Sequence, residues 1–283
     1  MRTVAFTILA LTAFAANSVL CRAALGEGAI DAASFSALRL FAGALTLSLL
    51  VMLRPGRTRL AGSWRSAIYL LVYAVPFSFA YESLATGTGA LILFGSVQAT
   101  MVIAAMRAGE RPTWLQWLGV LTAFGGLVYL MLPGVSAPDP LGSALMAVAG
   151  VGWGFYSLQG RTATDPLSET AGNFVRSVPL VALIGAANLG AMQIGSTGAA
   201  LAVTSGALAS GVGYAMWYAA LPGLTATAAA TVQLSVPVLA ALAGVLLMAE
   251  AVTPRLVIAS LLILGGVALA LLKRRLPEPS KGR

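Results

Sequence analysis

Gly109-Glu110-Arg111-Pro112, followed by the apolar stretch 113–132 with its Gly125-Gly126 pair, is the part of the sequence that decides the fold, because the chain repeats it. The second copy begins at Glu250, continues to Pro254 and is followed by an apolar stretch that contains Gly265-Gly266. In both copies the glycine pair lies 15 residues after the glutamate, and the copies are 140 residues apart in a chain of 283. A repeat of this length indicates two related halves.

The composition places the protein in a membrane. Hydrophobic residues make up 59% of the chain, charged residues only 9%, and the mean hydropathy is +0.90. Soluble domains carry roughly 25% charged residues. The net charge of +8 lies in short loops between apolar runs, which is typical of a membrane protein with an oriented charge bias and not of a nucleic-acid-binding surface. We therefore expect the lipid bilayer as a partner and no nucleic acid.

A membrane-spanning helix needs about 20 predominantly apolar residues, and the sequence contains ten runs of about this length. The ten runs are 3–24, 32–53, 65–85, 88–107, 113–132, 141–160, 168–190, 198–220, 226–248 and 253–272. The first run resembles a signal peptide in its basic start and alanine-rich end, but we interpret it as a span. The prediction is an all-α integral membrane protein with ten transmembrane helices.

The basic loop residues predict the orientation of these helices. Threading the ten runs puts most of the Arg and Lys residues on the side of both termini, and only Arg22 and Arg255 on the other. Both termini are therefore predicted to be cytoplasmic. Five spans separate the two copies of the repeated stretch, so Glu110 is expected on the cytoplasmic face and Glu250 on the external face. This arrangement predicts two inverted five-helix repeats, 1–137 and 138–274, followed by a basic cytoplasmic tail, 275–283, and inverted repeats are frequent in secondary transporters.

These features together resemble a known family. Ten short spans in two halves, each with a Glu and a nearby Pro before a glycine-containing last helix, resemble the EamA-type branch of the drug/metabolite transporter superfamily over about 3–272. The tryptophan- and tyrosine-rich spans are most similar to those of YddG-type aromatic amino-acid exporters. The resemblance implies a secondary transporter of the bacterial inner membrane that exports aromatic or neutral amino acids, or similar small amphipathic metabolites, by alternating access. We expect no cofactor, and we expect that the protein can act as a monomer.

Polar and aromatic side chains deep in the spans are the candidates for a substrate site near the midplane. The polar candidates, which could bind a substrate's amine and carboxylate or join helices by hydrogen bonds, are Asn17, Gln98, Gln233 and Ser235. The aromatic candidates, which could stack on an apolar ligand or serve as core packing, are Phe14, Phe77, Tyr81, Trp153, Tyr156, Tyr214 and Tyr218. We expect the cavity near Gln98, Tyr81, Trp153 and Tyr214.

Two arginines lie inside predicted spans. Arg39 and Arg176 could bind a substrate carboxylate, but their positions one or two turns from the span ends favour snorkelling of the guanidinium to the interface. Glu82 is the only acidic residue near a span, at the outer end of the third. Without an acidic or histidine relay at mid-depth, the sequence leaves proton coupling and concentration-driven export open.

The residue inventory excludes most catalytic chemistry. The chain contains no histidine, and Cys21 is its only cysteine, which excludes disulfides within the chain and His–Cys metal sites. Lys273 and Lys281, the only lysines, lie near the C-terminus, so no P-loop is present. We therefore expect no enzyme, cofactor or metal site. The open alternatives are a carrier of phosphorylated or nucleotide-linked metabolites and a channel-like facilitator of small solutes.

Overall fold

The computed structural model describes residues 2–55, 59–107, 113–132, 137–224, 229, 232–233 and 235–271. This part of the chain is built of helices joined by turns and contains no strand. The helices of the first half are α1 (Arg2–Leu25), α2 (Ala32–Met52), α3 (Trp64–Ala80), α4 (Thr86–Arg107) and α5 (Trp114–Met131). Gly109, Glu110, Arg111 and Pro112 lie outside the described residues, whereas Glu250 lies within them.

The second half contains one helix of unusual geometry. The elements of the second half are α6 (Pro140–Gly160), α7 (Pro166–Ala187), η1 (Leu189–Ala191), α8 (Ser196–Thr204), η2 (Ser205–Val212), α9 (Gly213–Ala220), η3 (Leu221–Gly223), α11 (Ser235–Met248) and α12 (Pro254–Leu271). The segment η2 is a π-helix that joins α8 and α9 into one continuous helix. π-Helical turns are rare and occur mostly at functional sites, so η2 marks a region of interest.

Six helical stretches in the described residues are long and apolar enough to cross a bilayer. They are 2–25, 32–52, 86–104, 140–160, 166–187 and 196–223. The remaining described helices are shorter or less apolar; α3, for example, has 17 residues. Each of the ten predicted runs overlaps at least one helix, so the prediction of a helical membrane protein is confirmed. The number of membrane crossings remains a prediction.

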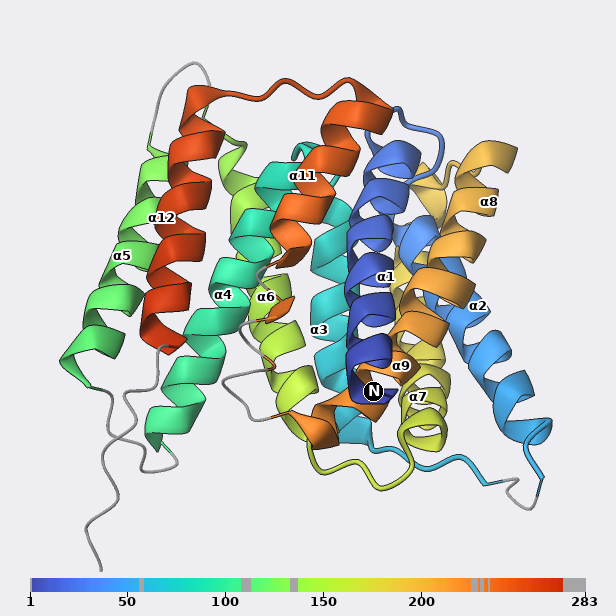
Figure 1. The fold of residues 1–283 in the computed structure, drawn as a ribbon. Coiled ribbons are helices and arrows are strands. Elements are labelled where there is room, and N and C mark those ends of the chain that lie inside the picture. Colours follow the sequence, from blue (N-terminus) through green and yellow to red (C-terminus); the bar gives the residue numbers. More distant parts are fainter. Residues whose placement is uncertain are drawn as a thin grey trace, which may run out of the picture.

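The helices stand side by side in one bundle, with α5 and α12 paired at one edge (Figure 1). We call the end of the bundle where α1 ends and α4 begins the upper end, as drawn in Figure 1, and the opposite end the lower end. One glycine of each pair explains the edge contact, Gly126 on α5 and Gly266 on α12. An added Cβ at Gly126 would lie 2.7 Å from Leu262 Cβ, and one at Gly266 would lie 2.5 Å from Ala123 N. The last helices of the two halves therefore pack on each other through glycine faces.

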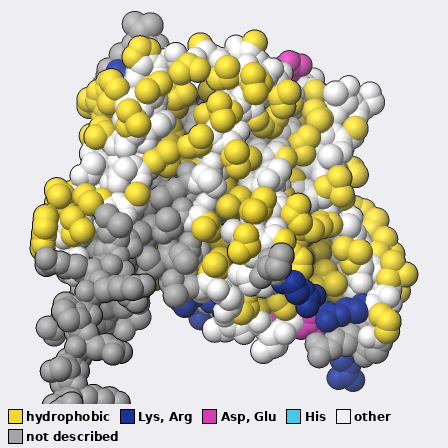
Figure 2. Space-filling model, in the orientation of Figure 1, with side chains coloured by type: hydrophobic (Ala, Val, Ile, Leu, Met, Phe, Trp, Pro, Cys, Tyr) yellow, Lys and Arg dark blue, Asp and Glu magenta, His cyan; other side chains and the backbone are white. Residues whose placement is uncertain are grey.

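The outer surface is apolar over the flanks of the bundle, as yellow side chains in Figure 2 show. Leu121 on α5 and Leu246 on α11 are 62% and 78% exposed, which suits contact with lipid. Dark blue Lys and Arg side chains gather at the lower end in this view. The described chain also begins and ends at that end (Figure 1). This distribution agrees with the predicted cytoplasmic placement of both termini.

Candidate functional site

Arg39 is the centre of a polar cluster inside the bundle. It lies two turns into α2, whose N-cap is Asp31, and its side chain is completely buried. The guanidinium Nε donates a hydrogen bond to Ser210 Oγ at 2.8 Å, and Nη2 donates to the hydroxyls of Tyr73 and Tyr214 at 3.0 and 2.7 Å. Gly206 lets η2 approach α2 here, because a Cβ at that position would overlap the carbonyl of Arg39.

The charge of Arg39 faces only neutral partners. Its Cζ atom lies 5.3 Å from the ring centroid of Tyr73 and 5.0 Å from that of Phe77, distances typical of cation–π contacts. Its third nitrogen, Nη1, is buried and has no hydrogen-bond partner among the described residues. A buried cation with a free donor and no acidic partner favours an anionic ligand.

This placement overturns the expectation that Arg39 snorkels to the interface. The side chain points into the bundle, because hydroxyl groups from α3, α9 and η2 supply hydrogen bonds that no interface position offers. Arg176 behaves as expected from snorkelling. It is partly exposed, and its Nη1 donates to the carbonyls of Ala61 and Gly172 at 2.7 and 2.8 Å.

Asn17 ties α1 to the same cluster. Its Nδ2 donates to the Tyr73 hydroxyl at 3.2 Å, and its Oδ1 accepts from Ser205 at 2.6 Å and from Ser210 at 3.3 Å. The Tyr214 hydroxyl donates to that of Tyr73 at 2.8 Å. Four elements, α1, α3, η2 and α9, thereby fix the hydroxyl groups around Arg39, and three of these side chains had not been predicted as site residues.

An aromatic wall adjoins the polar cluster. The ring centroid of Trp153 lies 5.1 Å from that of Phe14, 4.9 Å from that of Tyr73 and 4.7 Å from that of Tyr214. Trp153 Nε1 donates to Gln233 Oε1 at 3.0 Å. Phe14 lies in the first predicted half and Trp153 in the second, so their contact joins the two halves at the centre of the bundle.

A small cavity lies between the wall and α4. It is lined by Phe14, Ser18, Tyr73, Phe77, Leu93, Phe94 and Trp153. Its volume of about 10 Å³ accommodates about one water molecule. The cluster is therefore closed in this conformation, and a metabolite could enter only after the surrounding helices had moved apart.

The remaining candidates from the sequence do not line this cavity, although the ring centroid of Tyr156 lies 5.6 Å from that of Trp153. Tyr156 and Tyr218 are buried together, with ring centroids 5.0 Å apart, and Tyr218 donates to the carbonyl of Tyr156. Gln98 is buried on α4, one turn beyond Phe94. Ser235 is exposed at the start of α11. Of the predicted set, the structure brings together Phe14, Asn17, Arg39, Phe77, Trp153, Tyr214 and Gln233.

Sequence reasoning had left out Tyr73, Ser205 and Ser210. Tyr73 lies four residues before Phe77 on α3 and therefore shares its face, a periodicity that could have identified it. Ser205 and Ser210 lie five residues apart. That spacing does not bring two residues to one face of an α-helix, but the π-helical turn of η2 does.

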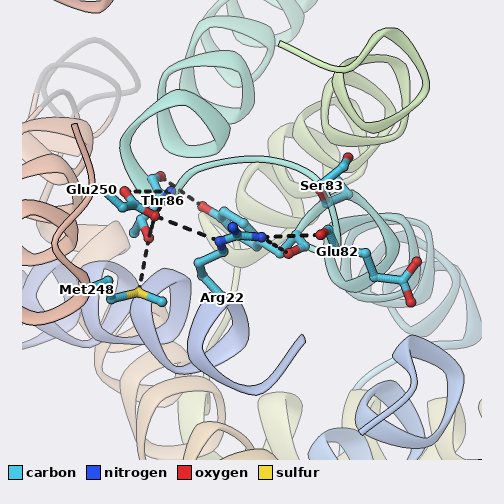
Figure 3. A network of polar contacts seen from close by, with 8 residues as sticks. Arg22, Glu82, Ser83, Thr86, Met248 and Glu250 are labelled. Atoms are coloured by element: carbon cyan, nitrogen blue, oxygen red, sulfur yellow. Dashed lines mark hydrogen bonds and ion pairs between the residues drawn. The ribbon is translucent and has the colours of Figure 1, made fainter. Parts of the chain in front are cut away.

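A second polar network contains Arg22, Thr86 and Glu250 (Figure 3) and includes Tyr81, whose hydroxyl donates to the carbonyl of Thr86 at 3.2 Å. Glu250 accepts hydrogen bonds from the backbone N–H of Thr86 at 2.8 and 3.0 Å and from its hydroxyl at 2.8 Å, and thereby caps α4. Arg22 lies 3.8 Å from the same carboxylate and donates to the carbonyls of Tyr81 and Glu82. Burial raises the pKa of the Glu82 carboxyl above its usual range.

We call these residues, Arg22, Tyr81, Thr86 and Glu250, the upper latch. It joins the end of α1, the turn between α3 and α4, and the segment after α11. The Tyr81 ring packs edge-on against Phe77, with centroids 4.8 Å apart, so the latch contacts a residue that lines the cavity. At the lower end, Arg54 and Asp165 form an ion pair at 2.9 Å between the end of α2 and the start of α7.

Comparisons with known proteins agree with this architecture. The model of the EamA-like transporter family matches residues 1–132 and 140–272. The uncharacterized protein PA1977 of Pseudomonas aeruginosa is 54% identical over 274 residues, covering 96% of each chain. The threonine/homoserine exporter RhtA of Escherichia coli is 30% identical over 263 residues, covering 85% of this chain and 81% of its own. A solved crystal structure with 22% identity matches 95% of this chain at a TM-score of 0.69, which shows a shared fold.

Proposed function

Because the chain belongs to the EamA-like transporter family, we propose that it exports small amphipathic metabolites that carry a carboxylate, with aromatic and other neutral amino acids as candidates. Family membership and the similarity to an exporter make the protein a membrane transporter and not an enzyme. The bacterial relatives support a place in the inner membrane.

One observation carries the proposal: the buried guanidinium of Arg39 with its free Nη1. Because Nε and Nη2 already donate to hydroxyl groups, a carboxylate would bind Nη1, and such charge-assisted hydrogen bonds are stronger than neutral ones. An incoming carboxylate would satisfy Nη1 and neutralise the buried charge. The neighbouring rings of Phe14, Phe77, Trp153 and Tyr214, with Asn17 and Gln233 beside them, would receive the body of the metabolite.

The closed cavity supports alternating access. A site with room for about one water molecule cannot conduct solutes as a channel does in this conformation, so transport requires the helices to open toward one face at a time. The upper latch closes the site toward the upper end. Carriers of phosphorylated metabolites would need several cations at the site, whereas Arg39 is the one basic side chain in the described central cluster.

The experiment is counterflow of radiolabelled phenylalanine, threonine and their carboxylate analogues into proteoliposomes that contain the purified protein. Arg39→Gln is expected to lower saturable counterflow by roughly 10- to 100-fold, the loss that corresponds to one charged hydrogen-bonding group. Arg39→Lys should retain part of the activity, because it keeps the charge but cannot make all the hydrogen bonds that hold the guanidinium to Ser210, Tyr73 and Tyr214.

The matched control is Arg176→Gln. This arginine also lies inside a predicted span, but its guanidinium binds backbone carbonyls at the protein surface, so the substitution should leave counterflow nearly unchanged. Unchanged counterflow in folded Arg39→Gln protein would contradict the proposed role of Arg39. Flux that does not saturate with substrate would indicate a channel-like facilitator instead.

A further inference from the structure

The fixed charge of the central site comes from Arg39 among the described residues. Its contacts are three neutral hydroxyl groups and two aromatic faces. The acidic residues in the described part lie in turns and at helix ends, toward the two ends of the bundle. These residues are Glu27, Asp31, Glu82, Asp139, Asp165, Glu169 and Glu250. The site thus carries a charge of +1 when it is empty and none after it has bound one carboxylate.

The groups beside Arg39 discriminate against a second positive charge. An α-ammonium group is held close to its own carboxylate, so it would lie near the guanidinium, where the low dielectric of the interior strengthens repulsion. The oxygen of Asn17 already accepts hydrogen bonds from Ser205 and Ser210, and the faces of Tyr73 and Phe77 already contact the guanidinium. These groups are therefore not free to bind an ammonium group. A hydroxyl or keto group at the same carbon requires no counter-charge and can join the hydroxyl network.

We propose that the substrate of this site is a monocarboxylate whose carboxylate is its only charge, such as a 2-hydroxy or 2-keto acid with an apolar body, and that the membrane potential drives its export. This rests on the proposed function of Arg39 in carboxylate binding. The loaded site is electrically neutral and crosses the field freely. The empty site carries +1, and an inside-negative potential returns it to the cytoplasmic side. Each cycle therefore moves one negative charge outward without a proton relay.

The size of the voltage effect follows from the charge moved. One elementary charge crossing about 100 mV shifts the equilibrium distribution about 50-fold. The same site carrying a zwitterionic amino acid would move no net charge over a cycle, so its equilibrium distribution would not respond to voltage. The response to voltage and the preference for a singly charged substrate therefore both report the net charge of the loaded site.

The test uses the wild-type protein in proteoliposomes at pH 7 with two isosteric pairs: phenylalanine with 3-phenyllactate, and threonine with 2,3-dihydroxybutyrate. Valinomycin and a potassium gradient set the potential, and protein-free vesicles give the passive leak. We expect counterflow of the hydroxy acids to exceed that of the matched amino acids at least tenfold. We also expect about 100 mV, inside negative, to lower their internal-to-external ratio about 50-fold at equilibrium.

Amino-acid counterflow equal to or faster than that of the hydroxy acids would overturn the monocarboxylate proposal, as would a hydroxy-acid distribution that ignores the potential or an absence of counterflow for all four compounds. Arg39-dependent transport of phenylalanine or threonine at rates equal to or above those of the matched hydroxy acids would overturn it while leaving the exporter function standing. Counterflow of either pair that survives Arg39→Gln unchanged would overturn both, because the carboxylate would then bind elsewhere.

Discussion

Arg39 is held in the interior by a balance of opposing terms. Removing a guanidinium from water costs several kcal/mol. Three hydrogen bonds from this charged group contribute about 1.5–3 kcal/mol each, and a desolvated cation–π contact contributes about 2 kcal/mol. These terms are of similar size, so the empty site is tolerated, and a carboxylate that pairs with the free Nη1 adds net stabilisation.

Trp153 and Gln233 allow a test at the level of single residues. Both are buried, and the indole N–H donates to the amide oxygen of Gln233 at 3.0 Å. Trp153→Phe leaves that oxygen without this donor, so we expect a loss of about 1–3 kcal/mol in the free energy of unfolding. Thermal unfolding in detergent measures it.

The double variant Trp153→Phe with Gln233→Met removes both partners and is the matched control. Replacing both polar groups by apolar ones is nearly neutral, so it should recover much of the stability lost in Trp153→Phe alone. Equal melting temperatures for wild type and the single variant would show that the hydrogen bond contributes nothing.

The upper latch joins three segments of the chain. These segments must separate for the cavity to open upward. Cys21, the only cysteine of the chain, is fully buried on α1 next to Arg22. Its reaction with a membrane-impermeant maleimide therefore reports opening of this end without any engineered cysteine.

Arg22→Gln and Glu250→Gln each remove one charge of the latch. We expect about tenfold faster labelling of Cys21 in both variants, the change that corresponds to the loss of one charged contact of about 1.4 kcal/mol. Arg54→Gln, which breaks the ion pair at the lower end, should label at the wild-type rate. Unchanged labelling in both latch variants would refute a closing role for this network.

The glycine pairs make a second prediction at the level of elements. A Cβ at Gly266 would lie 2.6 Å from the carbonyl oxygen of Gly119 on α5, whereas one at Gly265 meets nothing within 4 Å. Gly266→Ala should therefore destabilise the protein by about 1–3 kcal/mol through overpacking. Gly265→Ala should stabilise it by about 0.5–1 kcal/mol through helix propensity. Melting temperatures that move the same way for both variants would contradict direct packing of α5 on α12.

At the scale of the whole molecule, the distribution of basic residues predicts both termini on the cytoplasmic side, and ten crossings then place Glu250 on the external side. Fusions of a fluorescent protein to either terminus should fluoresce in bacterial cells, and alkaline phosphatase fused at either terminus should be inactive. Phosphatase inserted after Val252 should be active. An active phosphatase at the C-terminus, together with a fluorescent fusion at the N-terminus, would require an odd number of crossings.

The sequence predicted the positions of the helices better than it predicted which of their side chains point into the bundle. Each of the ten predicted runs overlaps a described helix, and Phe14, Asn17, Trp153, Tyr214 and Gln233 come together in one cluster. Tyr73 was recognisable only from its four-residue spacing to Phe77. The different environments of Arg39 and Arg176 were not recognisable from the sequence. Both arginines occupy similar places in their spans, but only Arg39 faces hydroxyl groups of neighbouring helices.

The repeated stretch, the apolar runs and the absence of catalytic residue sets were sufficient to determine the membrane class, the helical architecture and the family. The tertiary structure alone decided which side chains meet at the centre, that Arg39 points inward, and that a π-helical turn brings Ser205 and Ser210 to one site. The physical reason is the solvent. In water, an apolar stripe identifies the buried face of a helix, but in a bilayer the lipid-facing and core-facing sides are both apolar, so sequence periodicity carries little information about which side is which.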